Sequence, residues 1–134
     1  YPLQKFDSDT ERRFALLLER DALKWFKPAK GQFQIYYKLG SEQPEYIPDF
    51  VAELDGMILM VETKARVDLA SAEVQAKSAA ASRWCRHASE HAAEVGGKPW
   101  RYLVVPHDEV TEDKRLSDYL RFEVKGTAEG GSPA

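Results

Sequence analysis

The first part of the chain carries apolar residues at the spacing of a helix. Over 9–26 an apolar residue recurs every three or four positions, which is typical of one helix face packed on a core. The stripe consists of Phe14, Leu18, Ala22 and Trp25. Ser8 and Glu11 have capping-box spacing, in which each side chain bonds the other residue's backbone N–H at a helix start. We predict an amphipathic helix over 9–26, ended by Pro28 and Gly31.

The middle of the chain has the pattern of strands. Runs rich in aromatic and β-branched residues predict strands over 32–39, 46–54 and 57–65. The last two are joined by Asp55-Gly56, a dipeptide typical of a tight hairpin turn. The sequence therefore predicts a β-hairpin at the centre of the domain.

The second half predicts a long helix and one more strand. Residues 68–95 are rich in Ala and carry an apolar stripe, and Gly96-Gly97 is a typical helix stop. The compact apolar run over 100–106 predicts a buried strand. Residues 118–124 fit a short helix or an edge strand. The tail over 126–134 has little to bury, and we expect it to be disordered.

This order of elements predicts an α/β fold. Helix, three strands, helix and strand imply a sandwich in which helices flank a central mixed β-sheet. The chain has 134 residues, of which 43% are hydrophobic and 31% charged. These values suit one globular domain, which we assign to residues 1–125. The chain starts at Tyr1 without an initiator Met, so we expect it to be part of a longer polypeptide.

Composition also limits the compartment and the cofactors. No apolar run approaches the roughly 18 residues of a membrane span, and the N-terminus lacks a signal-peptide pattern. We therefore expect a cytoplasmic protein without a membrane partner. The single cysteine, Cys85, excludes an internal disulfide and a cysteine-based zinc site. His87 and His91 have i, i+4 spacing but no third ligand is evident near them.

The predicted hairpin gathers charged side chains on one face. Counting back from the turn, Asp49 lies opposite Glu62, and Lys64 lies two residues beyond on the same face. The opposite face is wholly apolar and is predicted to be core: Phe50, Ala52, Leu54, Met57, Leu59 and Val61. One face of the hairpin is thus predicted to be core, whereas the other carries the candidate catalytic side chains.

Two facing carboxylates repel each other across a strand pair. In a partly buried sheet they need a raised pKa, contact with water, or a cation. Oxygen ligands without His or Cys point to Mg²⁺ or Mn²⁺, and Mg²⁺ usually binds one or two carboxylates together with substrate phosphates. The alternative is a solvent-exposed face on which the charges are hydrated and Lys64 forms a salt bridge.

A family resemblance follows from these residues. Ile47-Pro48-Asp49 followed by Glu62-Thr63-Lys64 resembles the PD-(D/E)xK nuclease motif. The stretch over 46–105 is similar to the C-terminal endonuclease domain of type III restriction enzymes and related helicase-nuclease proteins. The resemblance implies a restriction-endonuclease-like sandwich and a Mg²⁺- or Mn²⁺-dependent endonuclease that cuts DNA in a prokaryotic cytoplasm. It also implies a helicase or ATPase domain in the same full-length protein. A homodimer is a further partner that the sequence leaves open.

The resemblance also implies roles for single residues. Asp49, Glu62 and the Thr63 backbone carbonyl would bind the metal, and Lys64 would orient or activate the attacking water and stabilise charge on the phosphate. Glu11 matches a further acidic ligand, although the capping box alone explains a Glu there.

Two residues of the second predicted helix complete the candidate list. Lys77 and Gln75 would reach the phosphate of the DNA, and the alternative for both is ordinary helix surface.

The overall charge weakens the expectation of a DNA-binding domain. The net charge is −3, whereas phosphate binding depends on Lys and Arg. Two other functions stay open. One is a catalytically idle DNA-binding or assembly module with the same fold, and the other is a sugar-hydrolysing enzyme with paired carboxylates. Lys64 beside the carboxylates favours the nuclease over both.

Overall fold

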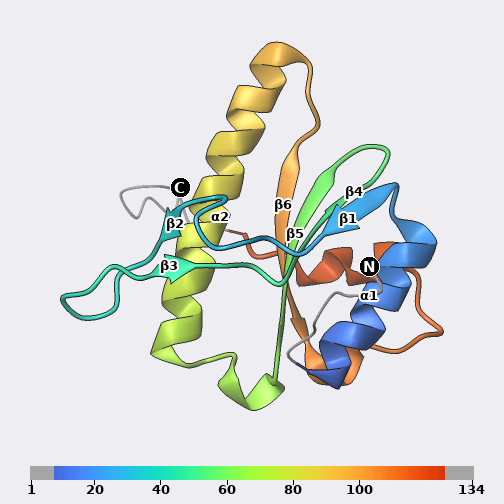
Figure 1. Ribbon diagram of the computed structural model, residues 1–134, viewed down its shortest axis with the longest axis horizontal. Helices are drawn as coiled ribbons and strands as arrows, with labels where there is room; N and C mark the ends of the chain where they lie inside the picture. The colour runs from blue at the N-terminus through green and yellow to red at the C-terminus, as the bar shows by residue number, and fades with distance from the viewer. Residues whose placement is uncertain (1–7, 126–134) are drawn as a thin grey trace.

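The computed structural model describes residues 8–125 and shows a mixed α/β fold in three layers (Figure 1). The central sheet has the strand order β1 (Lys24–Phe26), β4 (Phe50–Glu53), β5 (Ile58–Lys64) and β6 (Trp100–Pro106). β1, β4 and β5 are antiparallel, whereas β6 runs parallel to β5. The predicted tail over 126–134 lies outside the described residues. Within 8–125, no helix is long and apolar enough to cross a membrane.

Helices cover the two faces of this sheet. α1 (Asp9–Asp21) lies on one face together with the 3₁₀ helix η3 (Leu116–Phe122), and α2 (Ala72–Val95) lies on the other. α2 connects β5 to the parallel strand β6, as a crossover between parallel strands requires. Two further short 3₁₀ helices are η1 (Arg66–Asp68) and η2 (His107–Glu109).

A second, small sheet lies beside α2. It pairs β2 (Ile35–Tyr36) with β3 (Glu45–Tyr46) in antiparallel register. Ile35 and Tyr46 are buried in the same cluster as Ala81 of α2. This small sheet therefore helps to cover the α2 side of the central sheet.

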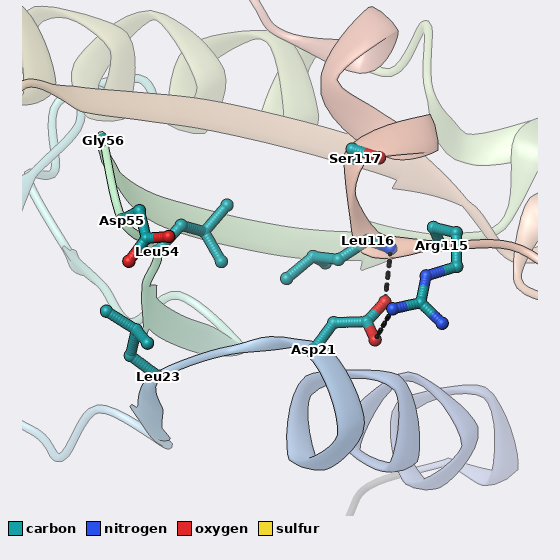
Figure 2. A pocket seen from close by; sticks show the side chains of 8 residues that line it. All are labelled: Asp21, Leu23, Leu54, Asp55, Gly56, Arg115, Leu116 and Ser117. Atoms are coloured by element: carbon teal, nitrogen blue, oxygen red, sulfur yellow. Dashed lines mark hydrogen bonds and ion pairs between the residues drawn. The ribbon is translucent and has the colours of Figure 1, made fainter.

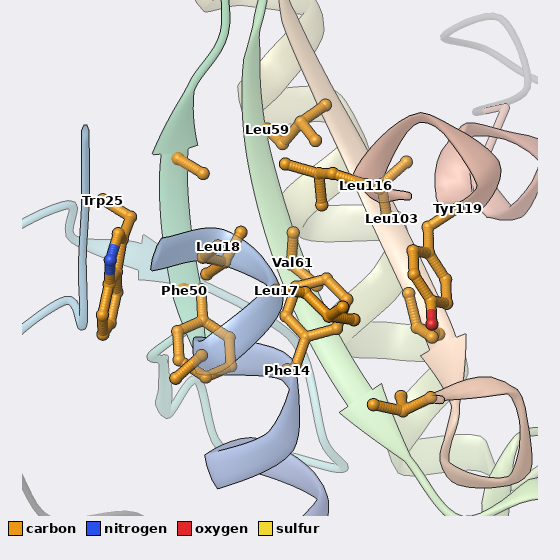
Figure 3. Packing of buried hydrophobic residues seen from close by; sticks show 14 residues of the cluster. Phe14, Leu17, Leu18, Trp25, Phe50, Leu59, Val61, Leu103, Leu116 and Tyr119 are labelled. Atoms are coloured by element: carbon orange, nitrogen blue, oxygen red, sulfur yellow. The ribbon is translucent and has the colours of Figure 1, made fainter. Parts of the chain in front are cut away.

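The hairpin has the predicted register. Phe50 pairs with Val61 and Glu53 with Ile58, and the Leu54 N–H donates to the Met57 carbonyl at 2.8 Å across the Asp55-Gly56 turn. The apolar hairpin face predicted to be core packs against α1 and η3 (Figure 3). The register and the core face of the hairpin are confirmed.

The first predicted helix was too long. α1 ends at Asp21, and Ala22 has an extended backbone (φ −91°, ψ 153°). Lys24–Phe26 instead forms β1 and pairs with β4. Trp25 is buried in β1, and a helix continued to residue 26 would also bury it, so the apolar stripe fits a helix and a strand alike. The strand is favoured because β1 pairs with the backbone N–H and C=O groups of β4, which would otherwise be an edge strand.

The first two predicted strands were also too long. The run over 46–54 is divided by Ile47 and Pro48, because proline has no N–H for the ladder; its start lies in β3 and its end in β4. The run over 32–39 keeps only β2 as a strand.

The helical predictions in the second half were closer. α2 starts at Ala72, where Ser71 accepts the N–H of Val74 as N-cap, and η1 precedes it. The two readings of 118–124 both hold in part, because η3 ends at Phe122 and Glu123 forms a bridge with Leu103. The strand over 100–106 is confirmed as β6.

Candidate metal centre

The two predicted metal ligands lie at the open end of the hairpin, away from its turn. Asp49 occupies a bend directly before β4, and Glu62 lies in β5. Asp49 Oδ2 accepts hydrogen bonds from the Thr63 backbone N–H at 2.8 Å and from Thr63 Oγ1 at 3.1 Å. These two bonds hold the Asp49 carboxylate against β5, next to Glu62.

Glu62 is buried on the α2 side of the sheet. Its residue exposure is 9%, and Oε1 accepts a hydrogen bond from the Tyr46 hydroxyl at 2.7 Å. The Tyr46 hydroxyl also contacts the Tyr102 hydroxyl at 2.9 Å. On the other oxygen of Glu62, the Lys64 Nζ lies 3.9 Å from Oε2. Glu62 therefore has a hydroxyl on one oxygen and an ammonium near the other.

The ionisation of the two carboxyl groups reflects this burial. Burial and, to a smaller extent, the charge of Asp49 raise the pKa of Glu62 to about 8, against the Tyr46 hydrogen bond and the charge of Lys64. Burial also raises the pKa of Asp49 to about 6, against the hydrogen bonds from Thr63. The two groups together therefore favour a bound proton or a bound cation near neutral pH. Of the alternative considered for these residues, the salt bridge of Lys64 with Glu62 is present, whereas Glu62 is buried and its charge is not hydrated as on an exposed face.

Glu11 and Lys27 approach the same carboxylate from the α1 side. Glu11 is 6% exposed, and its Oε1 accepts a hydrogen bond from Lys27 Nζ at 3.0 Å. The charge of Glu11 raises the pKa of Asp49, whereas the charge of Lys27 lowers it. Ser8 Oγ accepts the Glu11 N–H at 3.1 Å, as an N-cap should. The predicted helix start is thus present, and the Glu11 side chain turns to Lys27 in the interior.

The two candidate phosphate-binding residues of α2 have different positions. Lys77 Nζ lies 3.2 Å from Glu73 Oε2, and the charge of Lys77 lowers the pKa of Glu62. Gln75 is exposed, and its Nε2 donates to the Leu69 carbonyl at 2.9 Å. The structure therefore brings Lys77 near the carboxylates and holds the Gln75 amide at the start of α2.

The donor set at the hairpin fits a small hard cation. Among the residues that the structure describes, no group of three His, Cys, Asp or Glu side chains could hold a metal, so Glu11 does not converge with the other two. Mg²⁺ needs only one or two carboxylates, because it keeps several waters. Within 8–125, the hydrogen bonds to Asp49 reach its Oδ2, and the ammonium of Lys64 lies 3.9 Å from Glu62 Oε2. Asp49 Oδ1 and Glu62 Oε2 are therefore suited to a cation.

A pocket lies at the turn end of the hairpin, away from the two candidate metal ligands, and has different chemistry (Figure 2). Its volume is about 330 Å³, and its lining includes Asp21, Asp55 and Arg115. The Asp21 carboxylate is bonded to Arg20 and Arg115 and accepts the Leu116 N–H at 2.9 Å. The hydrogen bond from Arg20 is the main reason that the pKa of Asp21 falls to about 2. Asp21 is therefore an ionised, ion-paired carboxylate that ties α1 to η3 and supports the fold.

Sequence reasoning missed three residues of the site. Lys27 follows the predicted helix over 9–26, and nothing in the sequence indicated that its side chain lies near Asp49. In the structure the helix ends at Asp21. Tyr46 directly precedes the Ile47-Pro48-Asp49 motif, and Tyr102 lies in a strand recognised only as apolar. Their alternation in the strands was the one available signal, because Tyr102 pairs with Met60, two residues before Glu62.

No protein-family model matches this chain, and no curated protein matches it. Function is therefore inferred from the geometry of the site and from the motif that the site carries.

Proposed function

We propose that this chain is a Mg²⁺- or Mn²⁺-dependent endonuclease domain that hydrolyses phosphodiester bonds of DNA. The fold we propose is the restriction-endonuclease-like sandwich of the PD-(D/E)xK superfamily, and the helix–sheet–helix layers with a mixed four-stranded sheet support it. One observation carries the proposal. Asp49 and Glu62 are desolvated side by side, with the ammonium of Lys64 3.9 Å from Glu62 Oε2.

The residues divide the work of hydrolysis as follows. Asp49, Glu62 and the Thr63 backbone carbonyl would hold the cation. A bound divalent cation lowers the pKa of a coordinated water and neutralises charge on the phosphate. Lys64 orients the attacking water and stabilises negative charge that develops on the phosphate oxygens. Lys77, which lies on α2, binds a phosphate of the DNA.

The charge of the domain favours a role within a larger protein. A net charge of −3 provides little general attraction for a polyanion. We propose that a helicase or ATPase domain of the same full-length protein supplies most of the affinity for DNA. We place this protein in a prokaryotic cytoplasm. The isolated domain should then bind DNA weakly, and tight, salt-resistant binding by it would contradict this division of labour.

Cleavage assays test the proposal directly. We would incubate plasmid and single-stranded DNA with the domain and Mg²⁺ or Mn²⁺, with an EDTA control, and compare Asp49→Ala and Lys64→Ala with wild type. Glu53→Ala is the matched control, because Glu53 is a carboxylate at the other end of the same hairpin. Metal-dependent cleavage that both site variants lose and the control keeps is the expected result.

Metal binding decides the case in which wild type does not cut. Mn²⁺ titrated calorimetrically should bind wild type and fail to bind Asp49→Ala if the site is competent but lacks a partner domain. No binding by wild type would overturn the metal centre and leave the catalytically idle module as the better description.

A further inference from the structure

A chain of buried hydroxyl groups stands behind Glu62. Tyr46 from β3 and Tyr102 from β6 are 3% and 2% exposed, and their hydroxyls are 2.9 Å apart. Tyr46 donates to Glu62 Oε1 at 2.7 Å. These hydroxyl groups thus join the small sheet and the central sheet at one carboxylate.

The number of available protons determines which hydroxyl donates in each of these hydrogen bonds. An ionised carboxylate only accepts hydrogen bonds, and a tyrosine hydroxyl has a single proton. When Glu62 is ionised, as a carboxylate that holds a cation is, the Tyr46 proton lies on the bond to Glu62, and the bond between the two tyrosines then uses the proton of Tyr102. Each hydroxyl therefore donates toward Glu62, an order in which successive hydrogen bonds strengthen one another.

The geometry separates the two oxygens of Glu62. Oε1 is held by the Tyr46 hydroxyl, whereas Oε2 lies on the side of Lys64, 3.9 Å from its ammonium. A carboxylate fixed on one oxygen cannot rotate to offer the other in a different direction. Groups that hold a ligand in this way typically change metal affinity 10–100-fold when they are removed.

We propose that Tyr46 and Tyr102 are positioning residues of the metal centre, which hold Glu62 Oε1 so that Oε2 is presented to a divalent cation. This inference rests on the proposed metal-dependent function. It goes beyond it by assigning a role to two residues outside the motif, one of them on a separate sheet. The two rings fill the core, and the two hydroxyls orient the ligand.

Removing one hydroxyl at a time tests the proposal. We would measure Mn²⁺ affinity calorimetrically and the free energy of unfolding in urea for Tyr46→Phe and Tyr102→Phe. Tyr119→Phe is the matched control: Tyr119 is 0% exposed, and its hydroxyl donates to the Glu109 carbonyl at 2.9 Å in the core on the α1 side. This variant also removes the hydroxyl of a buried tyrosine and its hydrogen bonds, without a link to Glu62.

We expect affinity and stability to separate. Tyr46→Phe should weaken Mn²⁺ binding about tenfold or more, and Tyr102→Phe about threefold, because it acts through Tyr46. Tyr119→Phe should lower stability and leave Mn²⁺ affinity unchanged. In a Glu62→Gln background, Tyr46→Phe should have no further effect on Mn²⁺ affinity, as a double-mutant cycle detects.

Two results would overturn the inference, and they can be told apart. If Tyr46→Phe changes Mn²⁺ affinity no more than Tyr119→Phe, or has its full effect without the Glu62 carboxylate, the two tyrosines are structural and the metal centre stands. If wild type itself binds no Mn²⁺, the proposed function fails, and the positioning role fails with it.

Discussion

The two ends of the β4–β5 hairpin carry the same kinds of residue in opposite electrostatic states. At the turn end, Glu53 accepts a hydrogen bond from Lys98 Nζ at 2.6 Å and lies 3.6 Å from Lys24 Nζ. The bond from Lys98 lowers the pKa of Glu53. At the open end, burial raises the pKa of Glu62 to about 8 although Lys64 is near. A glutamate near a lysine is an ion pair with a lowered pKa in one place and a buried carboxyl group with a raised pKa in the other.

Packing around the hairpin causes this difference. The Glu53 side chain is 27% exposed and that of Glu62 11%, because Tyr46 and α2 cover the open end. Asp49 adds a second carboxylate there, whereas Glu53 has only cations around it. Strongly perturbed pKa values that arise from burial and a like charge are typical of functional sites. The turn end stabilises the fold, whereas the open end has the buried carboxyl groups at which we propose the cation site.

The largest expected effect is an opposite pH dependence of the two ends. The pKa of Glu62 rises from 4.5 to about 8 on folding, so its contribution to stability is full below pH 4.5 and is lost as pH rises through about 8. Asp49 acts in the same way between 3.8 and about 6. In metal-free buffer, the free energy of unfolding should fall by a few kcal/mol between mildly acidic and alkaline pH, at about 1.4 kcal/mol per pKa unit.

Urea unfolding at several pH values with EDTA measures this loss. Glu62→Gln should flatten the dependence, and Mn²⁺ should restore stability mainly at high pH, where the carboxylates are ionised. Glu53 has the opposite sign, since its lowered pKa adds stability that disappears only as pH falls below its ordinary value of 4.5. Stability that increases from neutral to alkaline pH without metal would contradict the burial of Glu62.

Replacing one lysine at each end of the hairpin should affect the cleavage rate only at the open end. Lys64→Ala should lower the cleavage rate at least about hundredfold, because it removes a positive charge where the phosphate becomes more negative. Lys98→Ala breaks the ion pair with Glu53 and should leave cleavage unchanged with a small loss of stability. Rates under single-turnover conditions are the measurement. Equal losses of activity in the two variants would show that neither lysine acts in the chemical step.

A smaller effect is expected from Glu11, which adds a third negative charge to the open end. Glu11→Gln should weaken Mn²⁺ binding about threefold to tenfold, because the Coulomb attraction of one carboxylate is lost. The ion pair with Lys27 at 3.0 Å also disappears in this variant. Calorimetry at fixed ionic strength measures the change. Tighter binding by the variant would show that Glu11 only repels Asp49.

The smallest effect concerns the lysine on α2. Glu73 holds Lys77 at 3.2 Å and accepts a hydrogen bond from the Tyr37 hydroxyl at 3.4 Å. Glu73→Gln should tighten DNA binding about two- to threefold, because Lys77 becomes available to a phosphate. Glu90→Gln, at another exposed site of α2, is the control for the change in net charge. Fluorescence anisotropy with a labelled oligonucleotide would show no difference between the variants if Lys77 does not contact DNA.

The local pattern of the sequence determined the hairpin. Asp55-Gly56 between two apolar runs specifies a tight turn, and the alternation of side chains then assigns Phe50 and Val61 to the core and Glu62 to the other face. A register shift by one residue would expose the whole apolar face, so local sequence and burial agree on one pairing. The prediction that Asp49 and Glu62 meet depended only on this register.

Tertiary structure alone decided what surrounds these carboxylates. The charge of Glu11 reaches Asp49 from α1, Lys27 reaches it from beyond β1, and Tyr46 reaches Glu62 from the small sheet. These contacts join residues far apart in the chain, and their distances depend on how the layers pack, which spacing along the sequence does not encode. The same packing set the degree of burial, and burial is the main reason that one glutamate of the hairpin has a raised pKa while the other is an ordinary ion pair.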